Sequence, residues 1–377
     1  MLIGVPREIK THEYRAGLTP ESVKVLAGDG HRIIVEAGAG AGMGSSDDDY
    51  RLAGAEISAA AADVFARCEL VVKVKEPLAA ERAMLRKGQV LFTYLHLAPD
   101  AAQLRELLAS GVTAIAYETV TAEKGGLPLL APMSEVAGRM SIQVAAHFLE
   151  RPSGGRGVLL PGARGVAVAR VLVLGAGVVG TSAADVAAGM GADVVVLNRS
   201  QAGLDRLNAQ LACRGMRART MLTDPEVVAR ELGQADAVIG AALVAGALAP
   251  RLVTRAMLGL MLPGAVLVDV SIDQGGCFET SRPTTHADPV YIVDGILHYC
   301  VANMPGAVPR TSAYALNGAT LPFVRKLAGQ GFRAALLADE HLRNGLNVHA
   351  GQLTCREVGK AQGVSWVDPL TALESGR

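Results

Sequence analysis

The feature that most constrains the fold of this chain is a glycine-rich turn between two apolar segments. The run Val171–Leu174 leads directly into Gly175-Ala-Gly-Val-Val-Gly180, and an alanine-rich stretch then continues to about Met190. A second run, Asp193–Asn198, ends 18 residues after the last glycine of the turn. A buried strand, a tight turn, a helix and another strand in this order predict a parallel βαβ unit.

The alternation of strands and helices extends over most of the chain. Thr19-Pro20 predicts the start of a helix, and a long amphipathic pattern from Pro132 to Glu150 predicts another. Alternating strands and helices are typical of parallel sheets with helices on both faces, so we predict an α/β fold with two Rossmann-like doubly wound domains and a cleft between them. Besides the two strands named above, we predict strands at Leu2–Val5, Arg32–Glu36, Leu70–Val74, Gln89–Tyr94, Val112–Tyr117, Ala235–Ala241 and Ala265–Val270.

Composition excludes several classes of function. Lys plus Arg equals Asp plus Glu at 36 each, and aromatic residues make up only 4% of the chain, so we expect neither nucleic-acid nor membrane-surface binding. No apolar run reaches the ~18 residues of a membrane span, and charge and proline interrupt the opening residues. The five cysteines are scattered without a Cys-x-x-Cys pair, so we expect no disulfide framework, no metal site and a cytoplasmic location.

The glycine turn has the spacing of a dinucleotide site. Gly175 permits the tight turn, Gly177 lets the backbone approach a pyrophosphate, and Gly180 lets the helix pack closely on the strand. The first helical residues, including Val178 and Val179, offer free N–H groups and a partial positive charge to the phosphates. The alternative is a glycine turn that serves packing alone.

The residue at the end of the second strand bears on which dinucleotide is bound. A carboxylate there would accept hydrogen bonds from the ribose hydroxyls and repel a 2′-phosphate. This chain has Asn198, which can bind a hydroxyl without that repulsion, and then Arg199, which could pair with a phosphate. NAD is the expected cofactor and NADP is possible; alternatively, Arg199 is only a solvated surface charge.

Several longer motifs resemble those of the alanine dehydrogenase family over essentially the whole chain and in the correct order. They are Ile3–Lys10, Glu13–Pro20, Val72–Pro77, Leu91–Leu97, Pro132–Met140, Val268–Gly276 and Val301–Pro305. The resemblance implies reversible conversion of L-alanine to pyruvate and ammonia, with hydride transfer to a nicotinamide dinucleotide, by a homo-hexamer. It further implies a substrate and catalytic domain from residues 1–130, a dinucleotide-binding domain from 131–310 and a helical return to the first domain over 311–377. Membrane-linked transhydrogenase subunits share this architecture.

The resemblance also implies which residues bind the amino acid. Arg15 and Lys75 match the family's substrate-binding cations, and an arginine can hold a carboxylate in a bidentate pair. A structural salt bridge is the alternative for Arg15. Lys73 would point to the opposite face of its strand, so we interpret it as structural or solvated. The remaining residues expected to line the pocket are Tyr94, Met133 and Asn303.

Two residues match the family's acid–base groups. His96 follows an apolar strand, and histidine titrates near neutrality, as proton transfer during imine hydration requires. Alone, such a histidine would more often be structural. Asp273 follows the strand of Leu267–Ile272 and is expected to assist His96, whereas Asp269 lies within the strand and is expected to make a structural bond.

The resemblance places further residues near the nucleotide, with departures from the family pattern. The matching positions are Ser134, Leu243, Ile272, Val301, Asn303 and Met304. Asn198 replaces the family's usual ribose-binding aspartate, and Gly203, Ala245 and Leu248 also differ from the usual residues. Other functions left open are dehydrogenation of another small amino acid, a transhydrogenase-like module and a non-catalytic nucleotide sensor.

Overall fold

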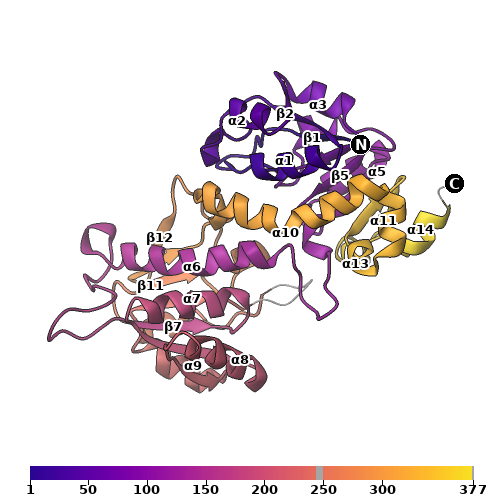
Figure 1. Ribbon diagram of the computed structural model, residues 1–377. Helices are drawn as coiled ribbons and strands as arrows, with labels where there is room; N and C mark the ends of the chain where they lie inside the picture. The colour runs from indigo at the N-terminus through magenta and orange to yellow at the C-terminus, as the bar shows by residue number, and fades with distance from the viewer. Residues whose placement is uncertain (243–248, 376–377) are drawn as a thin grey trace. The chain divides into compact units, whose positions relative to one another are not determined.

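The computed structural model describes residues 1–242 and 249–375 and divides the chain into two compact units. The first unit combines Met1–Met133 with Gly306–Arg377, and the second is Ser134–Pro305. Each unit is built on one sheet that is flanked by helices (Figure 1). Two such sheets, both mainly parallel, confirm the predicted α/β class.

The sheet of the first unit has eight strands in the order β15-β14-β6-β5-β4-β1-β2-β3. All neighbours from β6 to β3 are parallel, while β14 runs antiparallel to both β6 and β15. The strands are β1 (Leu2–Val5), β2 (Arg32–Glu36), β3 (Glu56–Ser58), β4 (Leu70–Val72), β5 (Val90–Thr93), β6 (Thr113–Ala116), β14 (Leu346–His349) and β15 (Gln352–Leu353).

Helices connect these strands, and four of them, α1, α2, α5 and α12, begin at a residue whose side chain caps them. Thr19 caps α1, where its side chain accepts a hydrogen bond from the Ser22 amide at 3.3 Å and Pro20 occupies the first turn, as predicted. The helices of this unit are α1 (Pro20–Gly28), α2 (Asp47–Leu52), α3 (Ala61–Arg67), α4 (Ala79–Arg82), α5 (Ala101–Ser110), α10 (Pro309–Gln330), α11 (Phe332–Ala338), α12 (Glu340–Arg343), α13 (Arg356–Gln362) and α14 (Pro369–Ser375).

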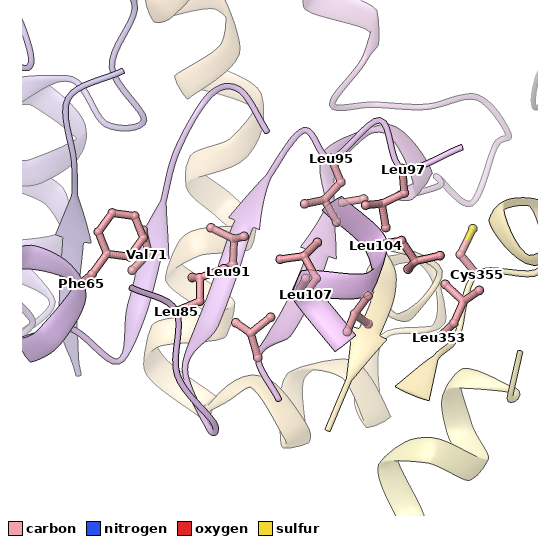
Figure 2. Close-up of a cluster of buried hydrophobic side chains, with 14 of the residues drawn as sticks. Phe65, Val71, Leu85, Leu91, Leu95, Leu97, Leu104, Leu107, Leu353 and Cys355 are labelled. Carbon is pink, nitrogen blue, oxygen red and sulfur yellow. The ribbon is translucent and has the colours of Figure 1, made fainter. Parts of the chain in front are cut away.

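A hydrophobic core fills one face of the first sheet (Figure 2). Leu91 of β5 and Val71 of β4 pack with Leu104 and Leu107 of α5, and all four side chains are at least 98% buried. Leu353 of β15 belongs to the same cluster. Burial of such side chains stabilises the sheet by about 1.5–3 kcal/mol each, so the core fixes the strand ends that carry the polar residues described below.

The sheet of the second unit has seven strands in the order β12-β13-β11-β10-β7-β8-β9. Only β12 is antiparallel to its neighbour. The strands are β7 (Arg170–Leu174), β8 (Asp193–Asn198), β9 (Arg219–Leu222), β10 (Ala237–Gly240), β11 (Val266–Asp269), β12 (Val290–Val293) and β13 (Ile296–Tyr299). Helices α7 (Val178–Gly189), α8 (Gln201–Ala212) and α9 (Pro225–Leu232) connect them, and α6 (Ala131–Phe148) precedes them.

The structure contains strands that the sequence did not predict. The segment 311–377, expected to be helical, also contributes β14 and β15 to the first sheet. β14 reads Leu-Asn-Val-His and is fully buried, but its two polar residues hide the apolar signal of a buried strand. Their side chains are paired inside the unit: Asn347 donates to the Thr119 hydroxyl at 2.8 Å, and His349 Nδ1 lies 3.0 Å from the Thr113 hydroxyl. The unpredicted β9 and β12 are half exposed.

Candidate active site

The loop after β1 carries Arg15, whose side chain is buried together with a carboxylate. Arg15 is 2% exposed, and its Nε and Nη2 atoms donate to the two Glu13 carboxylate oxygens at 2.6 and 2.5 Å. Burial opposes the charge, but the hydrogen bonds and charge of Glu13 still hold the pKa of Arg15 above its usual value. Nη1 lies 2.9 Å from the Met133 sulfur, so these two predicted substrate residues are in contact.

The two lysines after β4 have different surroundings. Lys73 is fully buried and its Nζ donates to Glu8 at 3.1 Å and to Glu81 at 2.5 Å, so it is structural and not solvated. Burial opposes its charge, but the two carboxylates hold the pKa of Lys73 above its ordinary value. Lys75 is held through its backbone, since its amide donates to Glu8 at 3.3 Å and its carbonyl accepts from the Thr93 hydroxyl at 2.9 Å.

Tyr94 and His96 follow β5, next to the end of β4. The Tyr94 hydroxyl donates to the Leu129 carbonyl at 2.5 Å, and burial raises the pKa of this phenol well above its usual value. The Tyr94 ring stacks on the His96 imidazole with a centroid distance of 5.8 Å. His96 itself is exposed, so its ring is accessible to a ligand.

Five predicted site residues therefore gather at the carboxyl edge of the first sheet. Arg15 touches Met133, Tyr94 stacks on His96, and the Tyr94 amide donates to the Val74 carbonyl, next to Lys75. Ligands of α/β folds bind at this edge of a sheet. The arrangement supplies two cations and one exposed imidazole.

Carboxylates that the sequence reasoning did not single out complete this edge. Glu13 forms the fork with Arg15, and Glu8 binds the amides of Val74 and Lys75. Glu76 pairs with Lys10; burial opposes its charge, but the charges of Lys75 and Lys10 hold the pKa of Glu76 below its usual value. Their positions inside the matching motifs, beside Arg15 and Lys75, are the signal that could have found them.

A cavity of about 450 Å³ lies beside Arg15. It is lined by Arg7–Ile9, Glu13–Arg15 and parts of Gly38–Gly42, and its lining includes neither Lys75 nor His96. Free alanine is much smaller than this space. The cavity therefore reaches Arg15 alone among the predicted substrate residues and does not by itself define the substrate pocket.

In the second unit, the glycine turn has the geometry that the motif predicts. Gly175 has φ 121°, which favours glycine, and a Cβ on Gly180 would lie 1.9 Å from the Gly175 carbonyl oxygen. A Cβ on Gly177 would meet nothing within 4 Å. Gly177 is also the N-cap residue of α7, and because it has no side chain it leaves the first amides of the helix uncapped. The open backbone at Gly177 and the uncapped helix start fit the pyrophosphate of a dinucleotide.

The Asn198 side chain at the end of β8 is hydrogen-bonded both to the glycine turn and to the loop that follows β8. Its Oδ1 accepts from the Ala176 amide at 3.3 Å, and its Nδ2 donates to the Ser200 carbonyl at 3.0 Å. A Cβ on Gly203 would lie 2.5 Å from that Nδ2, so the glycine leaves room for this conformation. Arg199 is exposed.

The remaining predicted residues lie at or after the ends of β11 and β13, except Ser134, which lies on α6. Asp269 is fully buried and accepts from the amides of Ser271 and Cys277 and from the Ser281 hydroxyl, so it is structural as expected. Asp273 is exposed on a short 3-10 turn, Ile272–Gln274. The other positions are Ile272, Val301 and Met304, all buried, together with half-buried Asn303 and Ser134.

Leu243, Ala245 and Leu248 lie outside the described residues. Within residues 1–242 and 249–375, no cluster of three or more His, Cys, Asp or Glu side chains could hold a metal ion. No helix in the same two stretches combines the length and apolar character needed to cross a bilayer.

Two family models match this chain. The model described as "Alanine dehydrogenase/PNT, N-terminal domain" matches residues 4–137, and "Alanine dehydrogenase/PNT, C-terminal domain" matches residues 141–356. The chain belongs to this family. Members similar to it include alanine dehydrogenases of Halomonas elongata, 55% identical over 99% of this chain and all of the relative, and of Mycolicibacterium smegmatis, 52% identical over 98% of each.

Solved structures of the alanine dehydrogenase/PNT family have the same architecture. An L-alanine dehydrogenase superposes with a TM-score of 0.92 at 48% identity, covering 96% of this chain and 99% of its own. A transhydrogenase from Sinorhizobium meliloti superposes with a TM-score of 0.80 at 27% identity, covering 94% and 100%. These matches confirm the family resemblance predicted from the sequence motifs.

Proposed function

We propose that this chain is an L-alanine dehydrogenase, which converts L-alanine reversibly to pyruvate and ammonia with a nicotinamide dinucleotide. The observation that carries the proposal is the set of side chains at the carboxyl edge of the first sheet, which this reaction requires. Enzymes named alanine dehydrogenase match the chain over 98–99% of its length, which supports the same conclusion.

Arg15 and Lys75 bind the substrate in this proposal. A guanidinium pairs with the carboxylate of alanine or pyruvate, and an ammonium adds a point charge for a carboxylate or carbonyl oxygen. Glu13 fixes the Arg15 guanidinium, which reduces the side-chain entropy lost on binding. Met133 and Tyr94 pack beside these groups, and we assign Asn303 to the same pocket.

His96 and Asp273 handle protons. Oxidation of the Cα–N bond gives an imine, which must take up water and lose ammonia. His96, an exposed imidazole, can remove a proton from the attacking water and return it to the leaving amine, as general acid–base catalysis requires. Asp273 assists the deprotonation of water or of the carbinolamine.

The second unit holds the cofactor through the turn Gly175–Gly180 and the start of α7. When bound, the dinucleotide supplies a nicotinamide ring that accepts the hydride of alanine Cα. We assign Ser134, Val178, Val179, Leu243 and Ile272 to the nucleotide site as well, with the residues after β13 (Val301, Asn303 and Met304).

We propose NAD as the usual cofactor and NADP as an accepted alternative. Both hydrogen-bonding groups of the Asn198 amide are already bound, Oδ1 to Ala176 and Nδ2 to Ser200, and no carboxylate at this strand end repels a 2′-phosphate. Arg199, exposed next to it, could pair with that phosphate. A homo-hexamer in the cytoplasm, as the family resemblance implies, is part of the same proposal.

The test is a spectrophotometric panel of alanine, serine, glycine and 2-aminobutyrate, each with NAD and with NADP. Alanine should give the highest kcat/KM with either cofactor. If another amino acid is oxidised faster than alanine, that amino acid becomes the proposed substrate. Reduction of NADP by NADH without any amino acid, at a rate above that of alanine oxidation, would instead support a transhydrogenase-like module.

The residue assignment is tested separately with a His96→Ala variant. Loss of general acid–base catalysis should lower kcat for alanine by about 10²- to 10⁴-fold. His147→Ala is the matched control, since His147 is 60% exposed on α6 and has no assigned role. Equal turnover of His96→Ala and the wild type would refute the role given to His96.

A further inference from the structure

The backbone of His96 adopts a conformation that residues other than glycine rarely occupy. Its φ is 48°, in the left-handed region. There the Cβ atom crowds the backbone, which makes this conformation unfavourable for a residue with a side chain. Such a conformation persists only where neighbouring groups hold it.

Glu118 supplies the groups that hold it. Its Oε1 accepts from the His96 amide at 2.6 Å and from the Leu95 amide at 3.1 Å, and its Oε2 lies 3.2 Å from the Leu95 amide. Glu118 belongs to the 3-10 turn Tyr117–Thr119 that follows β6. Because β5 and β6 are parallel neighbours, their C-terminal ends lie side by side. The Glu118 side chain after β6 is therefore next to the His96 backbone after β5.

The carbonyl groups of the same loop are bound as well. Buried Gln103 donates to the Leu95 carbonyl at 2.7 Å, and Gln362 of α13 donates to the Leu97 carbonyl at 2.5 Å. The Leu95 and Leu97 side chains are buried in the core cluster of Figure 2. The loop is therefore anchored on both sides of His96, and Glu118 binds the strained residue itself.

We propose that Glu118 is the positioning residue of His96. By binding two consecutive amides it stabilises the left-handed backbone, which directs the imidazole outward and parallel to the Tyr94 ring, at an interplanar angle of 14°. This inference rests on the catalytic role of His96 proposed above. Glu118 acts through the backbone and not on the substrate.

The first test compares Glu118→Ala and Glu118→Gln with the wild type. Removal of a charged hydrogen-bond acceptor should lower kcat by about 10- to 100-fold in Glu118→Ala, while KM for alanine and the Kd of NAD stay within about twofold. Glu118→Gln keeps one acceptor oxygen without the charge, so its kcat should lie between the two. Glu123→Ala, an exposed carboxylate on the following loop, is the matched control and should keep wild-type kcat.

A double-mutant cycle separates positioning from general stabilisation of the fold. If Glu118 acts through His96, Glu118→Ala should lower kcat little further in a His96→Ala background. An equal loss in both backgrounds would overturn the proposal, and so would wild-type kcat in Glu118→Ala. If Glu118→Ala fails to fold, Glu118→Gln takes its place in the same cycle, with the thermal unfolding midpoint as the check of integrity.

The same measurements distinguish failure of this inference from failure of the proposed function. Wild-type turnover of alanine by His96→Ala would refute the catalytic assignment on which the inference rests. Loss of turnover in His96→Ala together with full turnover in Glu118→Ala and Glu118→Gln would refute the positioning role alone.

Discussion

The carboxyl edges of the two sheets are built in opposite ways. On the first, charged side chains are buried and paired with carboxylates, as Arg15 is with Glu13 and Lys73 with Glu8 and Glu81. On the second, the turn from Gly175 to Gly180 presents backbone groups, and Arg199 and Asp273 are exposed. A small ligand with few atoms needs charges fixed in advance, whereas a long phosphate-bearing ligand can be held by backbone N–H groups along its length.

The difference predicts where substitutions act. Removal of one partner from a buried ion pair leaves a charge without compensation and destabilises the fold. Substitution at an open position of the glycine turn, such as Gly177, should leave the stability of the fold unchanged and change ligand binding. The four predictions below test this contrast, beginning with the largest expected effect.

Lys73→Met should lower the free energy of unfolding by about 3–5 kcal/mol, because Glu8 and Glu81 would remain buried without their cation. Urea unfolding of the variant and the wild type measures this difference in free energy. Lys75→Met is the comparison: in the proposed function its main loss is in kcat/KM for alanine. A Lys73→Met variant as stable as the wild type would contradict the structural role of this network.

Two glycines of the turn should respond differently to alanine. Gly180→Ala places a Cβ 1.9 Å from the Gly175 carbonyl oxygen, so the unfolding free energy should fall by about 1–3 kcal/mol. The Cβ added in Gly177→Ala enters open space, so the unfolding free energy should stay within about 0.5 kcal/mol of the wild-type value. The added methyl should instead weaken NAD binding about tenfold, measured by fluorescence titration. Unchanged NAD affinity in Gly177→Ala would argue against pyrophosphate at this turn.

Arg199→Ala should reduce kcat/KM for NADP by about five- to tenfold and leave that for NAD within twofold, because only NADP carries the 2′-phosphate. Arg206→Ala, an exposed arginine on α8, is the control. An equal loss with both cofactors would show that Arg199 acts on the shared part of the dinucleotide or on the fold.

Buried histidines in each unit should make stability depend on pH. Burial lowers the pKa of His298 in β13 and of His349 in β14 below the ordinary value of 6.5. The unfolded chain therefore binds more protons, and stability should decline as pH falls from about 6.5 through the folded-state pKa values. Thermal unfolding between about pH 5 and 7 measures this slope. His298→Gln and His349→Gln should each flatten it, and an unchanged slope in both would contradict these shifts.

Much of the fold followed from local pattern. The strands Leu2–Val5, Arg32–Glu36 and Asp193–Asn198 have the predicted bounds because each is an apolar run between turn residues. β14 was missed because its asparagine and histidine are satisfied by threonine side chains distant in sequence. Partners of this kind are set by tertiary structure and leave no local signal.

The candidate site shows the same limit. The family motifs singled out Arg15, Lys75 and His96, and the structure brings Arg15 to Met133 and His96 to Tyr94. Glu8 and Glu13 stand inside the matching motifs, but Glu118, which binds the His96 backbone, could not be assigned from sequence. Glu118 is 22 residues from His96 in the chain, and their hydrogen bond exists only because β5 and β6 are neighbours.

The contribution of β14 and β15 to the first sheet has a consequence for synthesis of the chain. During translation, Ser134–Pro305 is complete before residues 346–353 emerge from the ribosome, so the second unit can fold while β6 still ends the first sheet with unpaired backbone groups. The unit that begins first is thus the last to finish. A nascent chain arrested before residue 346 would expose a strand edge that chaperones or a neighbouring nascent chain could bind.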